Sequence, residues 1–241
     1  MARVLGTKRR RSRKKGQQDL PLQERFKHGG KRKRAGRKRV APRPQVKHRR
    51  RPALGEDHPV LVTWRVLDHV WSMQSKRSFR VLLRAFRPAV ERFGARITHF
   101  SVQGNHLHLI VEANGTQALS SAMQGLGVRI AKGLNRLMGR AGKVFVDRFH
   151  AHALGSPTEA RNAIDYVLGN TRIHAQRQGR AVTSYVDRFA VSHEQLGDET
   201  AWWRSFDDGS PPVAPPASWL LEKGWRLAKP RRAAPIFAFP V

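Results

Sequence analysis

The chain contains no cysteine, and acidic side chains are scarce relative to basic ones. Without cysteine it has no disulfide framework, no thiolate metal site and no thiol nucleophile. Its 241 residues carry 47 Lys and Arg but only 17 Asp and Glu, which gives a formal net charge of +30. This excess lies far outside the balance of an ordinary cytosolic enzyme and predicts a polyanionic partner.

Long apolar runs are also missing. No stretch approaches the roughly 18 apolar residues that a membrane span needs, and the basic N-terminus lacks an apolar segment of signal-peptide length. We therefore expect a soluble protein of the cytoplasm, associated with the nucleoid and without a membrane partner. An Arg-rich organellar presequence is the alternative interpretation of the N-terminus.

The charge divides the chain into three predicted segments. Residues 1–52 hold 22 basic and 2 acidic side chains, which leaves 25 and 15 for the remainder. Because residues 1–55 lack apolar periodicity, we expect a disordered basic arm that contacts phosphates, or a solvated charge run that adds only solubility. Residues 56–178 carry the regular apolar patterns of a folded domain. Residues 179–241 are expected to form a loop-rich extension containing Trp and Pro.

The pattern of residues 96–113 predicts two strands joined at Gly104-Asn105, a pair that suits a tight hairpin turn with positive φ at its first residue. This turn sets the register of the cross-strand pairs, which are Gln103 with His106, Ser101 with His108 and His99 with Ile110. One face of the hairpin is then apolar, with Phe100, Val102, Leu107, Leu109 and Val111. The other face carries His99, Ser101, His106 and His108.

His106 and His108 lie two residues apart on one strand, so their imidazoles share a face and are close enough to ligate one cation. A pair of this kind is weak evidence alone, because ligation needs at least one more donor. A second pair, His150 and His152, shares a face if a strand extends that far.

Apolar spacing predicts the remaining elements of the domain. A strand is expected at 60–66, then a helix whose apolar residues run from Phe79 to Phe93, divided by Pro88 and ended by Gly94. A second helix is expected over about 117–139, and a fourth strand at 143–149. This order predicts an α+β, ferredoxin-like split βαββαβ fold with an antiparallel sheet and helices on one face. The histidine face would be the open one.

The second helix has an apolar stripe and a basic face. The basic face comprises Arg129, Lys132, Arg136 and Arg140. It is a candidate for contact with a nucleic-acid backbone, and an ordinary solvated helix face is the alternative. Arg148 and His150 are further candidate nucleic-acid contacts.

A final helix is predicted to begin at Ser156, which can cap it, with Pro157 at the first helical position and Glu159 completing a capping box. Its buried stripe comprises Ala160, Ala163, Ile164, Val167 and Leu168. Tyr166 and Asn170 are four residues apart, so one flank of the helix is expected to present a phenol beside an amide.

These motifs together resemble a known family. The segment Gly-Asn-His106-Leu107-His108-Leu-Ile-Val-Glu, followed about 60 residues later by Tyr166-Val-Leu-Gly-Asn170, resembles the HUH single-strand transposases with one catalytic tyrosine. The resemblance is strongest to their REP-associated tyrosine transposase branch and covers roughly residues 58–176.

The resemblance implies an enzyme that cleaves and transfers single-stranded or hairpin DNA. By analogy with the family, His106, His108 and Asn170 would hold a divalent cation, Mg or Mn, and Tyr166 would attack the scissile phosphate to form a 5′-phosphotyrosine. Imidazoles are unusual ligands for Mg, because hard cations favour oxygen donors, so Mn or a transition metal is expected to bind more tightly in solution. Members of the wider family act as monomers or homodimers, and the sequence does not choose between them.

Two other functions are compatible with the sequence. One is a non-catalytic nucleic-acid-binding protein that uses the basic arm and the basic helix, although such a protein would not need both histidines, Tyr166 and Asn170 together. The other is a replication or relaxase-type HUH nickase, which commonly has a longer chain with added domains.

Overall fold

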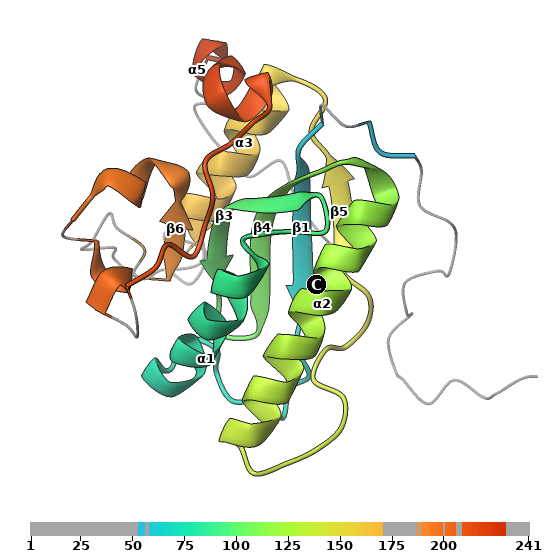
Figure 1. Cartoon of the computed structure of the whole chain (residues 1–241), viewed down its shortest axis with the longest axis vertical. Helices are drawn as coiled ribbons and strands as arrows, with labels where there is room; N and C mark the ends of the chain where they lie inside the picture. Colours follow the sequence, from blue (N-terminus) through green and yellow to red (C-terminus); the bar gives the residue numbers. More distant parts are fainter. Residues whose placement is uncertain are drawn as a thin grey trace, which may run out of the picture. The chain divides into compact units, whose positions relative to one another are not determined.

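The computed structural model describes residues 53–55, 58–170, 187, 189–199, 201–205 and 209–229. The predicted basic arm, except for residues 53–55, lies outside the described residues. The described part has an α+β fold with an antiparallel sheet in the order β2-β3-β4-β1-β5, and β6 pairs with β3 (Figure 1). None of its helices is long and apolar enough to cross a bilayer.

The strands and helices follow the predicted alternation with several shifts in position. The strands are β1 (Val60–Arg65), β2 (Glu91–Arg92), β3 (Ala95–Val102), β4 (His106–Ala113), β5 (His150–Ala153) and β6 (Ala190–Ser192). The α-helices are α1 (Lys76–Phe86), α2 (Gly115–Leu137), α3 (Pro157–Leu168) and α5 (Trp225–Leu227). Shorter helical segments are η1 (Arg87–Ala89), η2 (His193–Gly197), η3 (Trp202–Ser205) and η4 (Leu220–Gly224).

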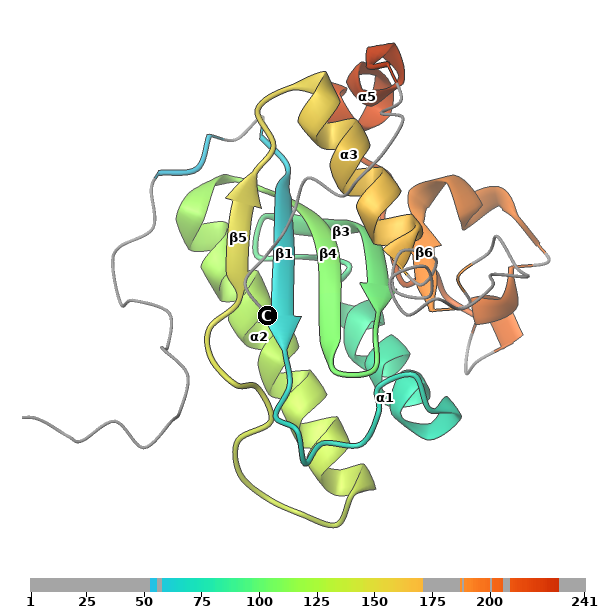
Figure 2. The same ribbon diagram turned by 180° about the vertical axis from the view of Figure 1, so that it is seen from behind.

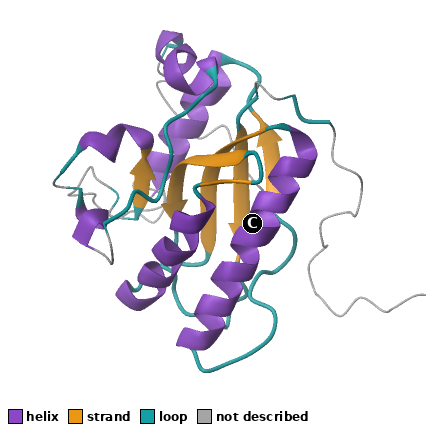
Figure 3. Cartoon of the chain, viewed as in Figure 1, coloured by secondary structure: helices purple, strands orange, loops and turns teal. Residues whose placement is uncertain are grey.

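Helices cover both faces of the sheet, as Figure 3 shows. Helices α1 and α2 pack on one face against the apolar side chains of β1, β3 and β4, and this cluster is the main core. Helix α3 packs on the opposite face, seen from behind in Figure 2, where it contacts β3, β4 and β6. The face that carries the histidines is therefore partly covered, and not fully open as predicted.

The predicted register of the β3–β4 hairpin is confirmed. Ser101 pairs with His108 and His99 with Ile110, and the Gln103 amide donates to the His106 carbonyl over 2.8 Å. The predicted turn geometry is wrong, because Gly104 is not among the described glycines with positive φ. The turn is held from outside instead, since its carbonyl groups accept hydrogen bonds from the segment that follows β1.

The first helix ends as Pro88 predicts, with α1 stopping at Phe86 and the short η1 carrying the proline. The expected continuation to Phe93 is wrong. Residues 91–92 form β2, which pairs with β3 through a two-residue turn at Phe93-Gly94. A helical spacing of apolar residues therefore spans three different elements here, because proline removes a donor and breaks the helical hydrogen-bond ladder.

The predicted fourth strand at 143–149 is also wrong in position. Only an isolated bridge between Val66 and Phe145 forms there, and the regular strand β5 begins at His150. The apolar residues of 143–149 serve a different purpose: Phe145 stacks on Trp64 with ring centroids 3.8 Å apart. Trp64 also donates from Nε1 to the Asp147 carbonyl over 2.9 Å. These side-chain contacts add to two backbone hydrogen bonds, from the Leu67 amide to the Val144 carbonyl over 2.8 Å and from the Val146 amide to the Arg65 carbonyl over 2.9 Å, and no regular strand forms.

Trp64 also explains a glycine in the middle of α2. A Cβ atom at Gly127 would lie 2.3 Å from the Trp64 ring, so only glycine lets the helix approach the indole this closely. The predicted apolar stripe of α2 is buried in the same core from Leu119 to Leu134.

The start of α3 is confirmed. The Ser156 hydroxyl accepts a hydrogen bond from the Glu159 amide over 3.2 Å, and Pro157 occupies the first helical position. The Glu159 carboxylate accepts from the Gly155 amide over 2.7 Å, so the capping interaction extends one residue further back than expected. This cap fixes where the helix begins and therefore which face Tyr166 occupies.

Parts of the predicted C-terminal extension belong to the folded unit. Strand β6 adds to the edge of β3, and the Trp203 side chain is fully buried in the main core. The Ala214 amide donates to the Ile97 carbonyl over 2.8 Å. Leu220 and Leu221 pack beside α3 on the other face of the sheet.

Candidate active site

The two predicted metal-ligating histidines lie side by side on β4. The ring centroids of His106 and His108 are 5.4 Å apart, with the planes nearly perpendicular. His108 is fully buried, and its Nδ1 is 3.1 Å from the Thr63 hydroxyl on β1. His106 is half-buried and its Nδ1 contacts the Asn105 side chain. Each imidazole is thus oriented through Nδ1, which directs Nε2 to the opposite side of its ring.

Tyr166 is next to His108 within the same chain. The ring centroids are 4.9 Å apart in an edge-to-face arrangement. This contact exists because α3 lies against β3 and β4, with Ala163, Ile164 and Val167 packed on Leu61 and Ile110. The structure therefore brings together the phenol and the imidazole pair that the motifs singled out.

Asn170 lies just beyond the helix, since α3 ends at Leu168 and Gly169 is its C-cap. Helix α3 is therefore shorter than an uninterrupted helix through Asn170 would be, although Asn170 itself is again helical. Its side chain is nevertheless fully buried. Neither the amide oxygen nor the amide nitrogen has a hydrogen-bond partner among the described residues. Such a group costs free energy unless a ligand satisfies it.

A row of polar side chains crosses the sheet through His108. Cross-strand pairing aligns Ser101, His108, Thr63 and His150 on the face that α3 approaches. His150 is exposed on β5, beyond the part of the face that α3 contacts. The second predicted histidine pair therefore shares a face with the first, and the row connects a buried imidazole to solvent.

Asp187 joins this row from the C-terminal extension. The Ser101 hydroxyl accepts a hydrogen bond from Gln103 over 2.9 Å and lies 3.5 Å from the Asp187 carboxylate. Asp187 is buried and also accepts from the Phe189 amide over 2.9 Å. Sequence reasoning missed this carboxylate, because it lies in a stretch without periodicity and no motif marks it.

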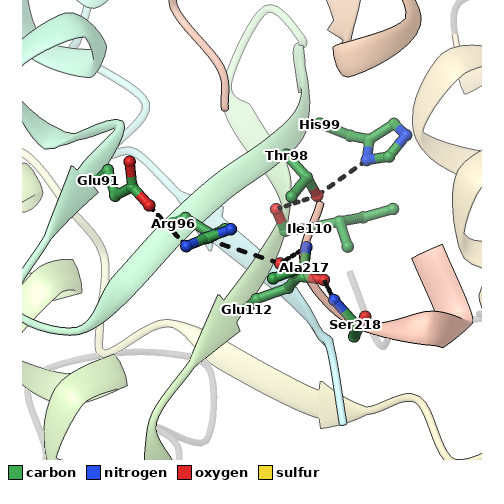
Figure 4. Close-up of polar contacts among 8 residues, drawn as sticks. All are labelled: Glu91, Arg96, Thr98, His99, Ile110, Glu112, Ala217 and Ser218. Atoms are coloured by element: carbon green, nitrogen blue, oxygen red, sulfur yellow. Dashed lines mark hydrogen bonds and ion pairs between the residues drawn. The ribbon is translucent and has the colours of Figure 1, made fainter. Parts of the chain in front are cut away.

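A third histidine, His99, is buried on the same face of β3. Burial and the nearby His193, 4.9 Å away between ring centroids, lower the pKa of His99 to about 3. Burial also lowers the pKa of His193. The His99 Nδ1 is 3.0 Å from the Thr98 hydroxyl, which donates to the Ile110 carbonyl over 3.2 Å (Figure 4). His99 is therefore a neutral packing residue.

The C-terminal segment also packs against α3. Glu112 at the end of β4 accepts hydrogen bonds from the amides of Ala217 and Ser218, both over 2.8 Å (Figure 4). These contacts set the start of η4, whose Leu220 and Leu221 pack on α3. The helix that carries Tyr166 is thus held by contacts with both the sheet and residues 220–225, which together we call the α3 clamp.

The predicted nucleic-acid contacts are divided between the two faces. Arg129, Lys132, Arg136 and Arg140 lie on or just after α2, which covers the face opposite His108 and Tyr166. Arg148 is partly buried in the loop before β5, and His150 lies on the face of the site. The basic face of α2 is therefore not part of the histidine–tyrosine cluster.

Among the described residues, no group of three or more His, Asp and Glu is arranged to hold a metal ion. A cation here would need the two imidazoles together with an amide or with oxygens of a substrate or water. Asn170 has a buried amide without a hydrogen-bond partner among the described residues, which is a group of the required chemistry.

Comparisons with known protein families and with curated protein sequences find no match. Among solved structures, a REP-associated tyrosine transposase bound to a REP hairpin matches with a TM-score of 0.48 and 16% identity, over 72% of this chain and 100% of that chain. A candidate transposase from Deinococcus radiodurans matches with a TM-score of 0.33 and 10% identity, over 57% of this chain and 100% of that one. A bacterial tRNA(His) guanylyltransferase-like protein in complex with GTP matches with a TM-score of 0.37 and 14% identity, over 53% and 68% of the two chains. All three similarities are distant.

Proposed function

We propose that the chain cleaves and transfers single-stranded DNA in a metal-dependent reaction with Tyr166 as the nucleophile. The observation that carries the proposal is the contact between Tyr166 and His108, with ring centroids 4.9 Å apart, beside the second imidazole of His106. A tyrosine that only packs needs no pair of oriented histidines. The strongly basic composition supports a polyanionic substrate.

The cation would be held by His106, His108 and Asn170, with water or phosphate oxygens in the remaining positions. When bound, it would neutralise charge that develops on the scissile phosphate. Thr63 would orient the His108 ring through the Nδ1 contact of 3.1 Å, as an outer-shell partner commonly does for a metal-ligating histidine.

The proposed reaction exchanges one phosphate ester for another. As the Tyr166 oxygen bonds to phosphorus, the phenol proton is released and the bond from phosphorus to the 3′ oxygen breaks. The departing oxygen takes up a proton, which leaves a 5′-phosphotyrosine and a free 3′-hydroxyl. Because the ester bond is conserved in the adduct, attack by a 3′-hydroxyl transfers the strand without ATP.

The position of the polar row supports a route by which a substrate reaches the site. The row of Ser101, His108, Thr63 and His150 runs from beneath α3 to an exposed residue on β5, so an approaching strand can enter from that side. We propose that the strand is single-stranded DNA presented next to a hairpin, as the motif resemblance implies. A monomer is sufficient for this site, because the phenol and both imidazoles come from one chain.

The test is an adduct assay. The full chain is incubated with end-labelled single-stranded hairpin DNA and Mn²⁺, and covalent products are separated on a denaturing gel. We expect an adduct that chelator suppresses and that Tyr166→Phe abolishes while DNA binding is retained. Tyr185→Phe is the matched control, because Tyr185 is the only other tyrosine in the sequence, and it should leave the adduct unchanged.

The other outcomes separate the alternatives. DNA binding without any adduct across a library of hairpins would support a non-catalytic binding protein. Nicking through Tyr166 without transfer to a second strand would support a relaxase-type nickase. An adduct that persists in Tyr166→Phe would overturn the assignment of the nucleophile.

A further inference from the structure

The turn between β2 and β3 has a backbone conformation that phenylalanine rarely adopts. Arg92 pairs with Ala95 across the hairpin, and the two turn residues Phe93 and Gly94 have φ values of 57° and 70°. Two-residue hairpin turns with positive φ at both residues favour Asn or Gly at the first position, because a larger side chain is strained at positive φ. Phe93 is the only non-glycine residue with positive φ in the described part of the chain. An unfavourable backbone at this position points to a role for the side chain.

The Phe93 ring lies on the surface, beside Arg92 and near the position of Arg129 on α2. It is 51% exposed, and the guanidinium of Arg92 is 4.9 Å from its centroid. Its edge rests on α2 at Gly125, where an added Cβ would lie 3.3 Å from the ring and 3.5 Å from Nη1 of Arg129. An isolated exposed apolar side chain is ordinary. An aromatic residue at positive φ with a guanidinium group over its ring is not.

The surroundings of the ring are basic. Arg129 opens the basic face of α2, which continues through Lys132 and Arg136, both exposed. Two acidic side chains, Glu91 and Glu112, line the same pocket as Phe93, and both pair with Arg96, at 2.6 Å and 4.0 Å, so their charge is offset locally. Arg129, Lys132 and Arg136 share one face of α2, and the Phe93 ring lies near the Arg129 end of this row of positive charges.

We propose that Phe93, with Arg92 and Arg129, forms a base-stacking contact for single-stranded DNA. Aromatic rings and guanidinium planes both stack on bases, and flanking cations neutralise the adjoining phosphates. This contact rests on the DNA-binding part of the proposed function but not on its chemistry. It lies on the side of the sheet covered by α2, whereas Tyr166 lies on the other side.

The test measures affinity and folding stability in the same variant. Full-length protein is titrated into fluorescently labelled oligothymidylate of roughly 16 nucleotides, the upper end of single-strand site sizes, with chelator present so that no cleavage occurs. We expect Phe93→Asn to weaken binding about tenfold, the size of one lost stacking contact. Its thermal midpoint should stay equal or rise, because Asn suits the turn better than Phe. Phe93→Trp should bind as tightly as the parent.

Two results would overturn the proposal. One is unchanged affinity in Phe93→Asn, and the other is an equal loss of affinity for a fully paired duplex, since paired bases are not available to stack on the ring. Arg129→Gln provides a second measure, and we expect it to reduce the salt dependence of binding by about one phosphate contact. If the parent protein binds single strands but forms no Tyr166 adduct, the proposed cleavage chemistry is wrong. The binding titrations of the Phe93 variants still decide whether the stacking contact exists.

Discussion

The side chain of Asn170 is fully buried, and neither amide atom has a hydrogen-bond partner among the described residues. A buried polar group in this state costs about 1–3 kcal/mol, which an apolar side chain of similar size avoids. A ligand that satisfies the amide would reverse that cost. The residue therefore distinguishes a metal site from a packing position.

In the absence of metal, we expect Asn170→Leu to raise the free energy of unfolding by about 1 kcal/mol, because the buried amide is removed. In the presence of Mn²⁺, the variant should lack the additional stability that the cation gives the parent. The measurement is urea denaturation with and without Mn²⁺. Asn170→Asp is the matched variant, because it keeps an oxygen donor and should keep the metal response. A less stable Asn170→Leu that still responds fully to Mn²⁺ would contradict the role of Asn170.

His99 makes stability depend on pH. Its pKa is about 3 in the folded chain and 6.5 in its unperturbed form, so the unfolded chain binds a proton first as the pH falls. The stabilisation is therefore complete above about pH 6.5 and is lost progressively towards pH 3. Between pH 7 and pH 5 we expect His99 to contribute a loss of about 2 kcal/mol.

The check for His99 is a comparison of urea denaturation for the parent and His99→Gln at both pH values. The variant should be less stable at pH 7 but lose less stability between pH 7 and pH 5. Equal pH dependence in the two proteins would show that another group is responsible, with His193 the first to test.

At the scale of elements, the position of α3 depends on contacts with two parts of the chain. The sheet contacts it through Ile110 and Leu61, and Leu220, Leu221 and Trp225 pack in the same apolar cluster. Glu112 connects the two, because it lies on β4 and accepts from the amides of Ala217 and Ser218. Arg161 on α3 adds a contact over the Trp225 ring at 5.2 Å.

Glu112→Ala should loosen this clamp. Removing a buried carboxylate leaves two amides without their acceptor, so we expect faster hydrogen exchange at Ala217 and Ser218 and lower adduct yield, with β1 and β4 unchanged. Glu91→Gln is the matched control, because its carboxylate is largely exposed and pairs only at the surface with Arg96. Equal exchange in the two variants would rule out the clamp.

Several elements were predictable from the sequence because their signals are local. The β3–β4 register follows from a two-residue alternation, and the start of α3 follows from Ser156, Pro157 and Glu159. The failures have tertiary causes. Stacking of Phe145 on Trp64 replaces a strand at 143–149, and Pro88 lets the residues after α1 join the sheet as β2.

At the scale of the whole molecule, charge is the dominant property. The net charge is +30, and residues 1–52 contribute 22 basic and 2 acidic side chains. Lys and Arg side chains that neutralise phosphates release the counterions condensed on DNA, so binding depends strongly on salt. The plot of log affinity against log salt concentration has a slope of about −0.7 per phosphate contact for single strands. The location of the charge therefore predicts which part of the chain supplies affinity.

We expect deletion of residues 1–52 to weaken DNA binding at low salt and to flatten the plot of log affinity against log salt, while Tyr166 adduct formation at saturating DNA persists. The measurement is anisotropy at several salt concentrations for both chains. Unchanged slope would mean that the folded domain provides the phosphate contacts. Loss of the adduct at saturating DNA would mean that residues 1–52 contribute to the site itself.

The sequence by itself determined the net charge, which depends on composition alone. It also determined the hairpin register, the shared strand face of His106 and His108, and the cap of α3, because each of these depends on neighbours within a few residues. Only the tertiary structure decided which face of the sheet α3 covers, and therefore that Tyr166 meets His108. It also brought Asp187 to Ser101 and set the strained turn at Phe93. Those outcomes depend on packing between segments far apart in the chain, which no local pattern records.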